Sequence, residues 1–285
     1  MTHKLKRIIR AFIAVAKGQE LTVTNVNLKT AHPSQLLSEK TILITGGSSG
    51  IGKAIAKACL ASGAKVIITG RDETKLQKTK NELQQISQSI YAQNLDISEV
   101  SGLADVPQQI KLLTGSSVNV LVNNAGISKG NFDNLNEEEF SSVIDTNLKG
   151  TVFLTKSIAD DMVFNGIKGN ILNIISSSGN RPALSAYELS KWSLKGFTLG
   201  LAKKLIKNDI VVNGIAPGPT ATPMLKANED KNLYHPTNPS GRFTTPEEIA
   251  NLAVFLISDM GRQIVGDIIY MTGGAAVTTF DDIKY

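Results

Sequence analysis

From about Lys40 onward, the sequence alternates short apolar runs rich in β-branched residues with longer segments of amphipathic pattern. Runs such as Thr41–Thr45 and Lys65–Thr69 are too short for stable helices, and they predict strands that are buried on both faces. Strands that alternate with helices form a parallel sheet covered by helices on both sides. The pattern therefore predicts an α/β fold with three layers, α/β/α.

The predicted sheet and its helices occupy residues 40–285 and leave no room for a separate substrate domain. Further strands are expected at 89–95, 118–123, 170–175, 210–215 and 268–271, and helices at 52–61, 72–88, 98–113, 137–165, 185–207 and 246–257. We expect a single domain built on a doubly wound parallel sheet of Rossmann type.

Residues 1–39 are expected to form a separate leader, with a basic amphipathic helix over 1–17 and a linker that holds a short strand at 21–26. The net charge of the chain is +5, and it resides in this leader because the charges after residue 40 balance. A neutral body gives no electrostatic basis for binding nucleic acid. The leader helix could pack on protein, lie on an anionic membrane surface or stay solvated, and we favour packing on protein.

A single cysteine, Cys59, excludes an intrachain disulfide and is expected to be a small buried residue. No apolar run approaches the length of a membrane span, and the apolar stretch 11–16 is shorter than a secretory signal. We therefore expect a cytoplasmic protein. Its histidines, His3, His32 and His235, are scattered, so neither a metal site nor a catalytic histidine is expected.

A glycine-rich turn of the form G-x-x-x-G-x-G joins the first strand to the first helix. Glycine lets the backbone approach a ligand closely, and the N–H groups at a helix N-terminus bind pyrophosphate well. Tight turns use glycine widely, but this position between strand and helix favours dinucleotide binding. The expected contacts are Gly46, Ser48, Ser49, Gly50, Ile51 and Gly52.

The end of the second strand indicates which dinucleotide binds. A carboxylate at Thr69 or Gly70 would bind the ribose hydroxyls of NAD, but the sequence has none there and continues with Arg71. A guanidinium is well shaped to pair with the 2′-phosphate of NADP. We therefore expect NADP(H), while the neighbouring Asp72 keeps NAD(H) open.

Tyr187 and Lys191 are four residues apart on a predicted helix and so share one face of it. Such a pair is common, and its significance depends on other segments. These are Asn123-Asn124-Ala125-Gly126, Asn147, Ser176-Ser177-Ser178 after a strand, Pro217-Gly218 and Thr222.

With these segments in this order, the chain resembles the short-chain dehydrogenase/reductase family from about Lys40 to Gly274. The resemblance implies an oxidoreductase that transfers hydride between a nicotinamide and a carbonyl or secondary alcohol, such as a 3-oxoacyl, sugar or small ketone substrate. It implies a homodimer or homotetramer formed through helices 137–165 and 185–207. It also implies a catalytic tetrad of Asn147, Ser176, Tyr187 and Lys191.

The resemblance adds cofactor contacts outside the glycine-rich turn. Asp96 is expected at the adenine, although it could instead only cap the helix expected at 98–113. Pro217 and Gly218 could likewise form an ordinary turn. The full added set is Asp96, Asn124, Ala125, Gly126, Tyr187, Lys191, Pro217, Gly218 and Thr222.

The gap from Ser176 to Tyr187 is two residues shorter than the usual gap in the family. Aligning the strand 169–175 and Gly179 selects Ser176 as the catalytic serine and places the deletion in 180–185, with Ser177 and Ser178 as alternatives. The shortened loop borders the substrate cleft, which the segment 222–245 is expected to cover.

Tyrosine titrates at about pH 10, too high for a base near neutrality. An ammonium from Lys191 and an oxidised nicotinamide are expected to lower the pKa of Tyr187. Tyr187 would then be the general acid and base, and Ser176 would stabilise charge on the reacting oxygen. The alternatives are a catalytically silent NAD(P)-binding sensor and a membrane-peripheral NAD-dependent dehydrogenase.

Overall fold

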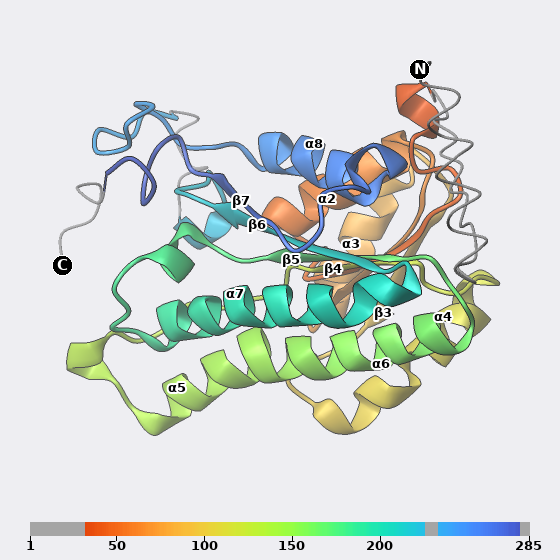
Figure 1. Cartoon of the computed structure of the whole chain (residues 1–285), viewed down its shortest axis with the longest axis horizontal. Helices are drawn as coiled ribbons and strands as arrows, with labels where there is room; N and C mark the ends of the chain where they lie inside the picture. The colour runs from red at the N-terminus through yellow and green to blue at the C-terminus, as the bar shows by residue number, and fades with distance from the viewer. Residues whose placement is uncertain (1–31, 226–232, 280–285) are drawn as a thin grey trace, which may run out of the picture. The chain divides into compact units, whose positions relative to one another are not determined.

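The computed structural model describes residues 32–225 and 233–279, and these contain one seven-stranded sheet in which every neighbouring pair is parallel (Figure 1). The strand order is β3-β2-β1-β4-β5-β6-β7. The strands are β1 Thr41–Thr45, β2 Lys65–Gly70, β3 Ile90–Asn94, β4 Val120–Asn123, β5 Asn170–Ile174, β6 Val211–Pro217 and β7 Ile268–Met271. The order reverses between β1 and β4, where folds of this type bind their ligands.

Helices cover both faces of the sheet, as expected (Figure 1). Alternate residues of β1 show the arrangement, because Ile42 and Ile44 belong to one hydrophobic core and Leu43 to the other. The first core takes side chains from α2 Gly50–Ala61, α3 Glu73–Leu83 and α8 Pro246–Ile257. The second takes them from α4 Val106–Thr114, α6 Thr151–Phe164 and α7 Ala186–Leu205. Burial on both faces explains the uninterrupted apolar runs.

Two predicted helices differ in detail from the structure. The helix expected at 98–113 consists of a 3-10 segment, η2 Val100–Asp105, followed by α4. Pro107 lies in the first turn of α4 and lacks an N–H group, which favours a new helix start at that point. The helix expected at 137–165 consists of α5 Glu137–Ile144 and α6, joined by a π-helical segment, η4 Asp145–Gly150.

The compact unit that contains the sheet begins at His32, ahead of the expected boundary at Lys40. Leu37 is fully buried in the core that holds α2 and α8, and its N–H donates to the carbonyl of Ser62 at 2.9 Å. Residues 32–39 therefore pack on the domain, which the linker assignment did not foresee. The predicted helix over 1–17 and strand over 21–26 lie outside the described residues.

Within the described ranges, no helix combines the length and the apolar character needed to cross a membrane. The same part of the chain contains no group of three or more His, Cys, Asp or Glu side chains arranged to hold a metal ion.

Candidate active site

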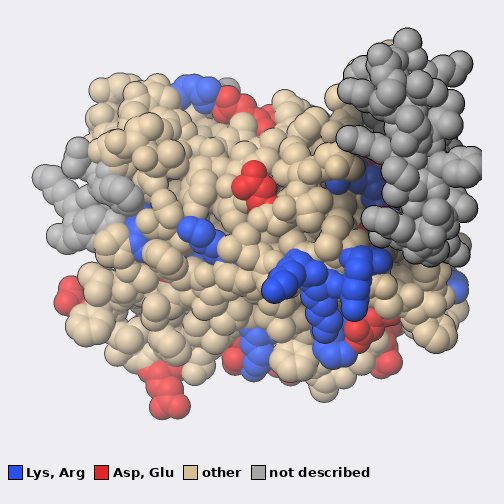
Figure 2. All heavy atoms as spheres, in the orientation of Figure 1, with Lys and Arg blue, Asp and Glu red and all other residues tan. Residues whose placement is uncertain are grey.

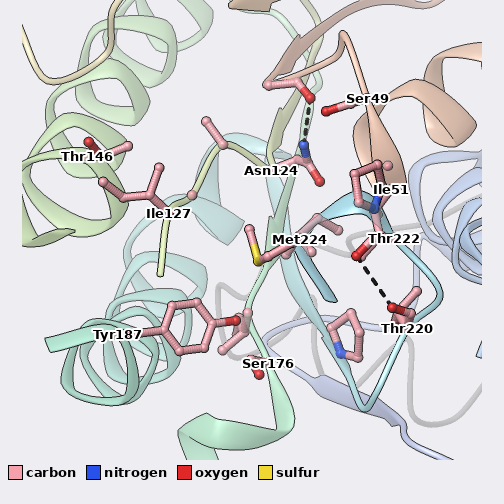
Figure 3. A pocket seen from close by; sticks show the side chains of 18 of the residues that line it. Ser49, Ile51, Asn124, Ile127, Thr146, Ser176, Tyr187, Thr220, Thr222 and Met224 are labelled. Atoms are coloured by element: carbon pink, nitrogen blue, oxygen red, sulfur yellow. Dashed lines mark hydrogen bonds between the residues drawn. The ribbon is translucent and has the colours of Figure 1, made fainter. Parts of the chain in front are cut away.

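The carboxyl ends of the strands open into a cavity of about 900 Å³ at the reversal of strand order (Figure 3). A cavity of this size suits a large organic cofactor. Nearly all the residues predicted from the sequence line it. The lining set is Gly46, Ser48, Ser49, Gly50, Ile51, Arg71, Asp96, Asn124, Ala125, Gly126, Ser176, Tyr187, Lys191, Pro217, Gly218 and Thr222.

Two predicted site residues, Gly52 and Asn147, do not line the cavity. Gly52 is buried, and a Cβ atom there would lie 2.4 Å from Nδ2 of Asn124 and 2.5 Å from the carbonyl oxygen of Gly46. Gly52 therefore lies behind the turn, and its direct contact with a cofactor stays a prediction. Glycine is needed there so that α2 can pack closely behind the turn.

The glycine-rich turn presents an uncapped helix end to the cavity. Helix α2 begins at Gly50, and Ser49 precedes it without forming a side-chain capping bond. Gly50 has a φ of +52°, a conformation that favours glycine. The first N–H groups of α2 are therefore available to an anionic ligand, as a pyrophosphate requires.

Asn124 fixes the wall opposite this turn. Its Nδ2 donates to the carbonyl oxygens of Thr45 and Gly46, at 2.9 and 3.1 Å (Figure 3). In return, Oγ1 of Thr45 accepts from the backbone N–H groups of Asn124 and Ala125, each at 3.0 Å. The ends of β1 and β4 are thus joined into one rigid edge beneath the cavity.

Arg71 and Asp96 meet at the end of the cavity next to β2 and β3, with Nη1 of Arg71 3.8 Å from Oδ2 of Asp96. The other carboxylate oxygen of Asp96 accepts from the N–H and the hydroxyl of Ser98, at 2.9 and 2.7 Å. Asp96 therefore lines the cavity and stabilises the turn that follows it. It does not cap the next helical segment, because η2 begins at Val100 after Glu99 without a side-chain cap, and its contact with the adenine stays a prediction.

Asp72 caps helix α3, since its Oδ1 accepts from the backbone N–H of Lys75 at 2.9 Å. The carboxylate of Asp72, which left binding of NAD(H) possible in the sequence analysis, is therefore bonded to the start of α3. Lys75 itself lines the cavity, a contact that the sequence analysis missed. Its place in the first turn of α3, just after Arg71, could have indicated it. Two cationic side chains, Arg71 and Lys75, thus line this end of the cavity.

Tyr187 lies in the first turn of α7 and points into the cavity beside Ser176 (Figure 3). A capping box sets the start of this helix. Oγ of Ser185 accepts from the N–H of Glu188 at 3.2 Å, and Oε2 of Glu188 accepts from the N–H of Ser185 at 3.0 Å. Lys191 follows one turn later, with its ammonium 5.6 Å from the centre of the Tyr187 ring.

Burial raises the pKa of Tyr187, and its hydrogen bond with Ser176 opposes that rise. The expected lowering by Lys191 is not found. The Lys191 ammonium donates to the carbonyl of Ile174 at 3.0 Å, and burial lowers its own pKa to about 8. The groups of the protein itself therefore keep Tyr187 in the protonated form.

Ser176 lies two residues after the end of β5 and precedes the 3-10 segment η5 Ser177–Asn180. Its Oγ accepts from the N–H of Ser178 at 3.1 Å, and its side chain lies beside the Tyr187 hydroxyl (Figure 3). Ser177 and Ser178 line the same cavity.

Asn147 lies in the π-helical segment η4 and is fully buried behind the cavity wall. Its Oδ1 accepts from the N–H of Ile127 at 2.8 Å, while its Nδ2 donates to the Ile127 carbonyl at 2.9 Å and to Oγ of Ser190 at 3.1 Å. The side chain thus joins η4, the segment after β4 and α7. Asn147 therefore supports the cavity wall in this structure, and its place in the catalytic tetrad stays a prediction.

The cavity is also lined by Met224, His235 and Phe243, which belong to the segment 222–245 that was expected to cover the substrate cleft. His235 packs edge-on against Phe243, with ring centroids 4.5 Å apart. Backbone bonds order this part of the chain, with His235 N–H donating to the carbonyl of Gly241 at 3.0 Å. Such pairing across a loop leaves no periodic signal in the sequence, so the individual contact of His235 with Phe243 was not predicted.

The chain matches the family model of short chain dehydrogenases over residues 40–233. It is 33% identical over 246 residues to the 3-oxoacyl-acyl-carrier-protein reductase FabG of Aquifex aeolicus, covering 84% of this chain and 98% of that protein. Among solved structures it is similar to a 3-ketoacyl-(acyl-carrier-protein) reductase from Brucella melitensis complexed with NADH, at 30% identity and a TM-score of 0.75, covering 83% of this chain and 98% of that one. It is also similar to the RhlG/NADP active-site complex of Pseudomonas aeruginosa, at 30% identity and a TM-score of 0.79, covering 86% of this chain and 100% of that one. The chain therefore belongs to the short-chain dehydrogenase/reductase family, whose members are oxidoreductases.

Proposed function

We propose that the protein is an NADP(H)-dependent oxidoreductase that reduces a carbonyl group, with Tyr187 as the general acid and, in the reverse direction, the general base. The observation that carries this proposal is the position of the Tyr187 side chain beside Ser176 inside a cavity that the glycine-rich turn also lines (Figure 3). These two hydroxyl groups can bind one carbonyl oxygen together.

The residues present fit a dinucleotide along the cavity. The uncapped N-terminus of α2 would bind the pyrophosphate, and Arg71 with Lys75 would bind a phosphate on the adenosine ribose. Lys191 would hold the nicotinamide ribose beside Tyr187. When bound, the nicotinamide supplies or accepts the hydride, and the protein orients the reactants and moves the proton.

In the reduction, the carbonyl carbon gains a hydride and the carbonyl oxygen gains the proton of Tyr187. The Ser176 hydroxyl donates a hydrogen bond to the same oxygen and so stabilises the charge that develops there. Burial favours the neutral phenol, which is the form that donates a proton.

The substrate end of the cavity favours a carbonyl compound with an apolar body. Its walls include Pro219, Pro223, Met224 and Phe243, with His235 as a polar neighbour. A 3-oxoacyl thioester has this character, and the FabG similarity supports that substrate class.

The function is tested by incubating the purified chain with NADPH and a set of carbonyl compounds, while nicotinamide absorbance is followed. The set holds a 3-oxoacyl thioester, a sugar and a small ketone. We expect oxidation of NADPH that depends on the thioester or the ketone. Binding of NADPH without turnover of any compound would favour the silent-sensor alternative.

Replacing Arg71 by aspartate is expected to shift cofactor preference from NADPH toward NADH. The change removes a cation and adds a carboxylate beside the expected 2′-phosphate, and loss of one charge-assisted bond of about 1.5–3 kcal/mol corresponds to roughly tenfold or more in kcat/KM for NADPH. The measurement is kcat/KM for both cofactors. Lys78→Asp is the matched control, because Lys78 lies exposed on α3 and does not line the cavity. An unchanged preference for NADPH over NADH would show that another residue binds the 2′-phosphate.

Reduction and oxidation are expected to depend on pH in opposite directions. Because the pKa of Tyr187 lies above its ordinary value of 10.0, the proton-donating phenol prevails at neutral and mildly alkaline pH. The rate of reduction should fall, and that of oxidation rise, as the pH increases toward this raised pKa. Initial rates in both directions across a pH series measure the effect. A reduction rate that increases with pH would contradict the assignment of Tyr187 as the proton donor.

We further propose a homodimer or homotetramer formed through α5, α6 and α7. Phe153 and Phe164 of α6 and Leu199 of α7 are large apolar side chains exposed to solvent. Figure 2 shows few charged side chains over the N-terminal half of α7, whereas lysine and arginine gather near its end. Light scattering of the purified protein measures the assembly.

A cytoplasmic location stays a prediction.

A further inference from the structure

We propose that Lys195 and Asn180 are positioning residues that hold the loop between Ser176 and Ser185 against helix α7. The inference rests on the proposed function, because the loop carries Ser176 at one end and forms a wall of the cavity.

Lys195 continues the row of Tyr187 and Lys191 along α7, in steps of four residues. Its ammonium donates to Oδ1 of Asn180 at 3.1 Å. The same ammonium lies 5.4 Å from the centre of the Trp192 ring and 5.8 Å from that of Tyr270 in β7. Two aromatic rings and an amide thus surround a half-buried cation, which fixes its position.

The amide of Asn180 accepts the bond from Lys195 through its oxygen and donates another through its nitrogen. Its Nδ2 donates to the carbonyl of Ala276 at 3.0 Å. Ala276 is buried and has a φ of +55°, a left-handed conformation that is strained for alanine and persists only where the surroundings hold it. The N–H of Ala276 donates to the carbonyl of Thr279 at 2.8 Å. Asn180 therefore bridges α7 and the turn after β7.

The residues on either side of Asn180 are fixed to the same helix. Nε1 of Trp192 donates to the carbonyl of Arg181 at 2.6 Å. On the other side, a Cβ atom at Gly179 would lie 3.0 Å from the carbonyl oxygen of Lys191, so the loop backbone packs directly on α7 beside the catalytic lysine. Three consecutive loop residues are thus anchored to the helix that carries Tyr187.

We expect this anchoring to affect turnover of the carbonyl substrate more than binding of the cofactor. Ser176, Ser177, Ser178 and Arg181 of the loop all line the cavity, whereas the glycine-rich turn and Arg71 belong to other elements. A shift of the loop would move the Ser176 hydroxyl relative to Tyr187 and leave the phosphate contacts in place. We call the contacts of Lys195 and Asn180 the clamp. Loss of the clamp should therefore change turnover of the carbonyl substrate without changing cofactor affinity.

The test compares Lys195→Met with Lys195→Arg and with the control Lys203→Met, a lysine exposed two turns later on α7. We expect Lys195→Met to lower kcat/KM for the carbonyl substrate about tenfold, as for loss of one charge-assisted hydrogen bond, with the Kd for NADPH unchanged. Lys195→Arg, which keeps the cation and its donors, should recover most of the activity. If Lys195→Met behaves like Lys203→Met, the proposal is wrong.

Asn180→Asp separates the two bonds, because it keeps an acceptor for Lys195 and removes the donor to Ala276. An intermediate loss is expected. An effect as small as that of Lys203→Met would show that the bond to Ala276 contributes nothing to positioning, and would overturn the bridging role of Asn180.

Trp192 is the only tryptophan of the chain, and its indole binds the loop, so its fluorescence reports the clamp directly. Lys195→Met should shift the emission of Trp192, and Lys203→Met should not. This readout needs no turnover. If no carbonyl compound is reduced, the proposed function fails while the clamp is still tested, and an unchanged emission spectrum would overturn the clamp alone.

Discussion

Replacing Tyr187 by phenylalanine is expected to lower the rate of carbonyl reduction by about 100- to 10,000-fold, the usual contribution of a positioned general acid. The change removes only the hydroxyl group and keeps the ring, so the packing of the first turn of α7 should persist. The Tyr187 hydroxyl lies beside Ser176 in the cavity, where both can meet one carbonyl oxygen (Figure 3). Without it, the proposed proton donor is lost.

The binding of NADPH by the Tyr187→Phe variant should be nearly unchanged, because the phosphate contacts lie on α2, Arg71 and Lys75. Steady-state rates and a fluorescence titration with NADPH measure the two quantities separately. Tyr91→Phe is the matched control, since Tyr91 lies in β3 and does not line the cavity. Retained activity would mean that another group donates the proton.

The strands were predictable because burial on both faces leaves a direct trace in the sequence. The run Thr41–Thr45 has the same bounds in the structure as in the prediction, and the turn after it could be placed on the cavity. Parallel strands bring their carboxyl ends to one edge, so the residues that follow β4, β5 and β6 had to meet near the turn.

The sequence could not show how deeply a residue lies beneath the cavity wall or how far it is removed from water. Gly52 and Asn147 belong to the right segments, yet they stand behind the cavity wall, and motif spacing does not distinguish a lining residue from the one that supports it. The effect of burial on the pKa of Tyr187 in the protein alone was missed for a related reason. A sequence shows that Lys191 is near, but not how far burial removes both groups from water.

Contacts between distant segments also escaped the sequence analysis. The pairing of His235 with Phe243 depends on a loop closed by backbone bonds, and Lys195 meets Asn180 and Tyr270 only after α7 packs on β6 and β7. None of these residues follows a helix or strand period that would connect it to its partner.

Replacing Ser176 by alanine is expected to cost about 100- to 1,000-fold in kcat, as when one donor to a developing oxyanion is removed. Ser178→Ala should have a much smaller effect, and it is a close control because the two residues share the same loop and both line the cavity. The difference follows from their positions. The Ser176 hydroxyl lies beside the Tyr187 hydroxyl, whereas Ser178 contacts Ser176 through its backbone N–H, which alanine retains (Figure 3).

The same substitution should also move the pH profile. The Ser176 bond opposes the rise in the pKa of Tyr187, so its loss should raise that pKa further and shift the gain of oxidative activity to higher pH. Reduction should lose rate through the missing donor, while its proton donor stays in the phenol form. Rates of both reactions for the two variants, followed across pH, separate these effects. If Ser178→Ala proves the more damaging change, the alignment through the shortened loop is wrong, and the hydroxyl that stabilises the reacting oxygen belongs to Ser178.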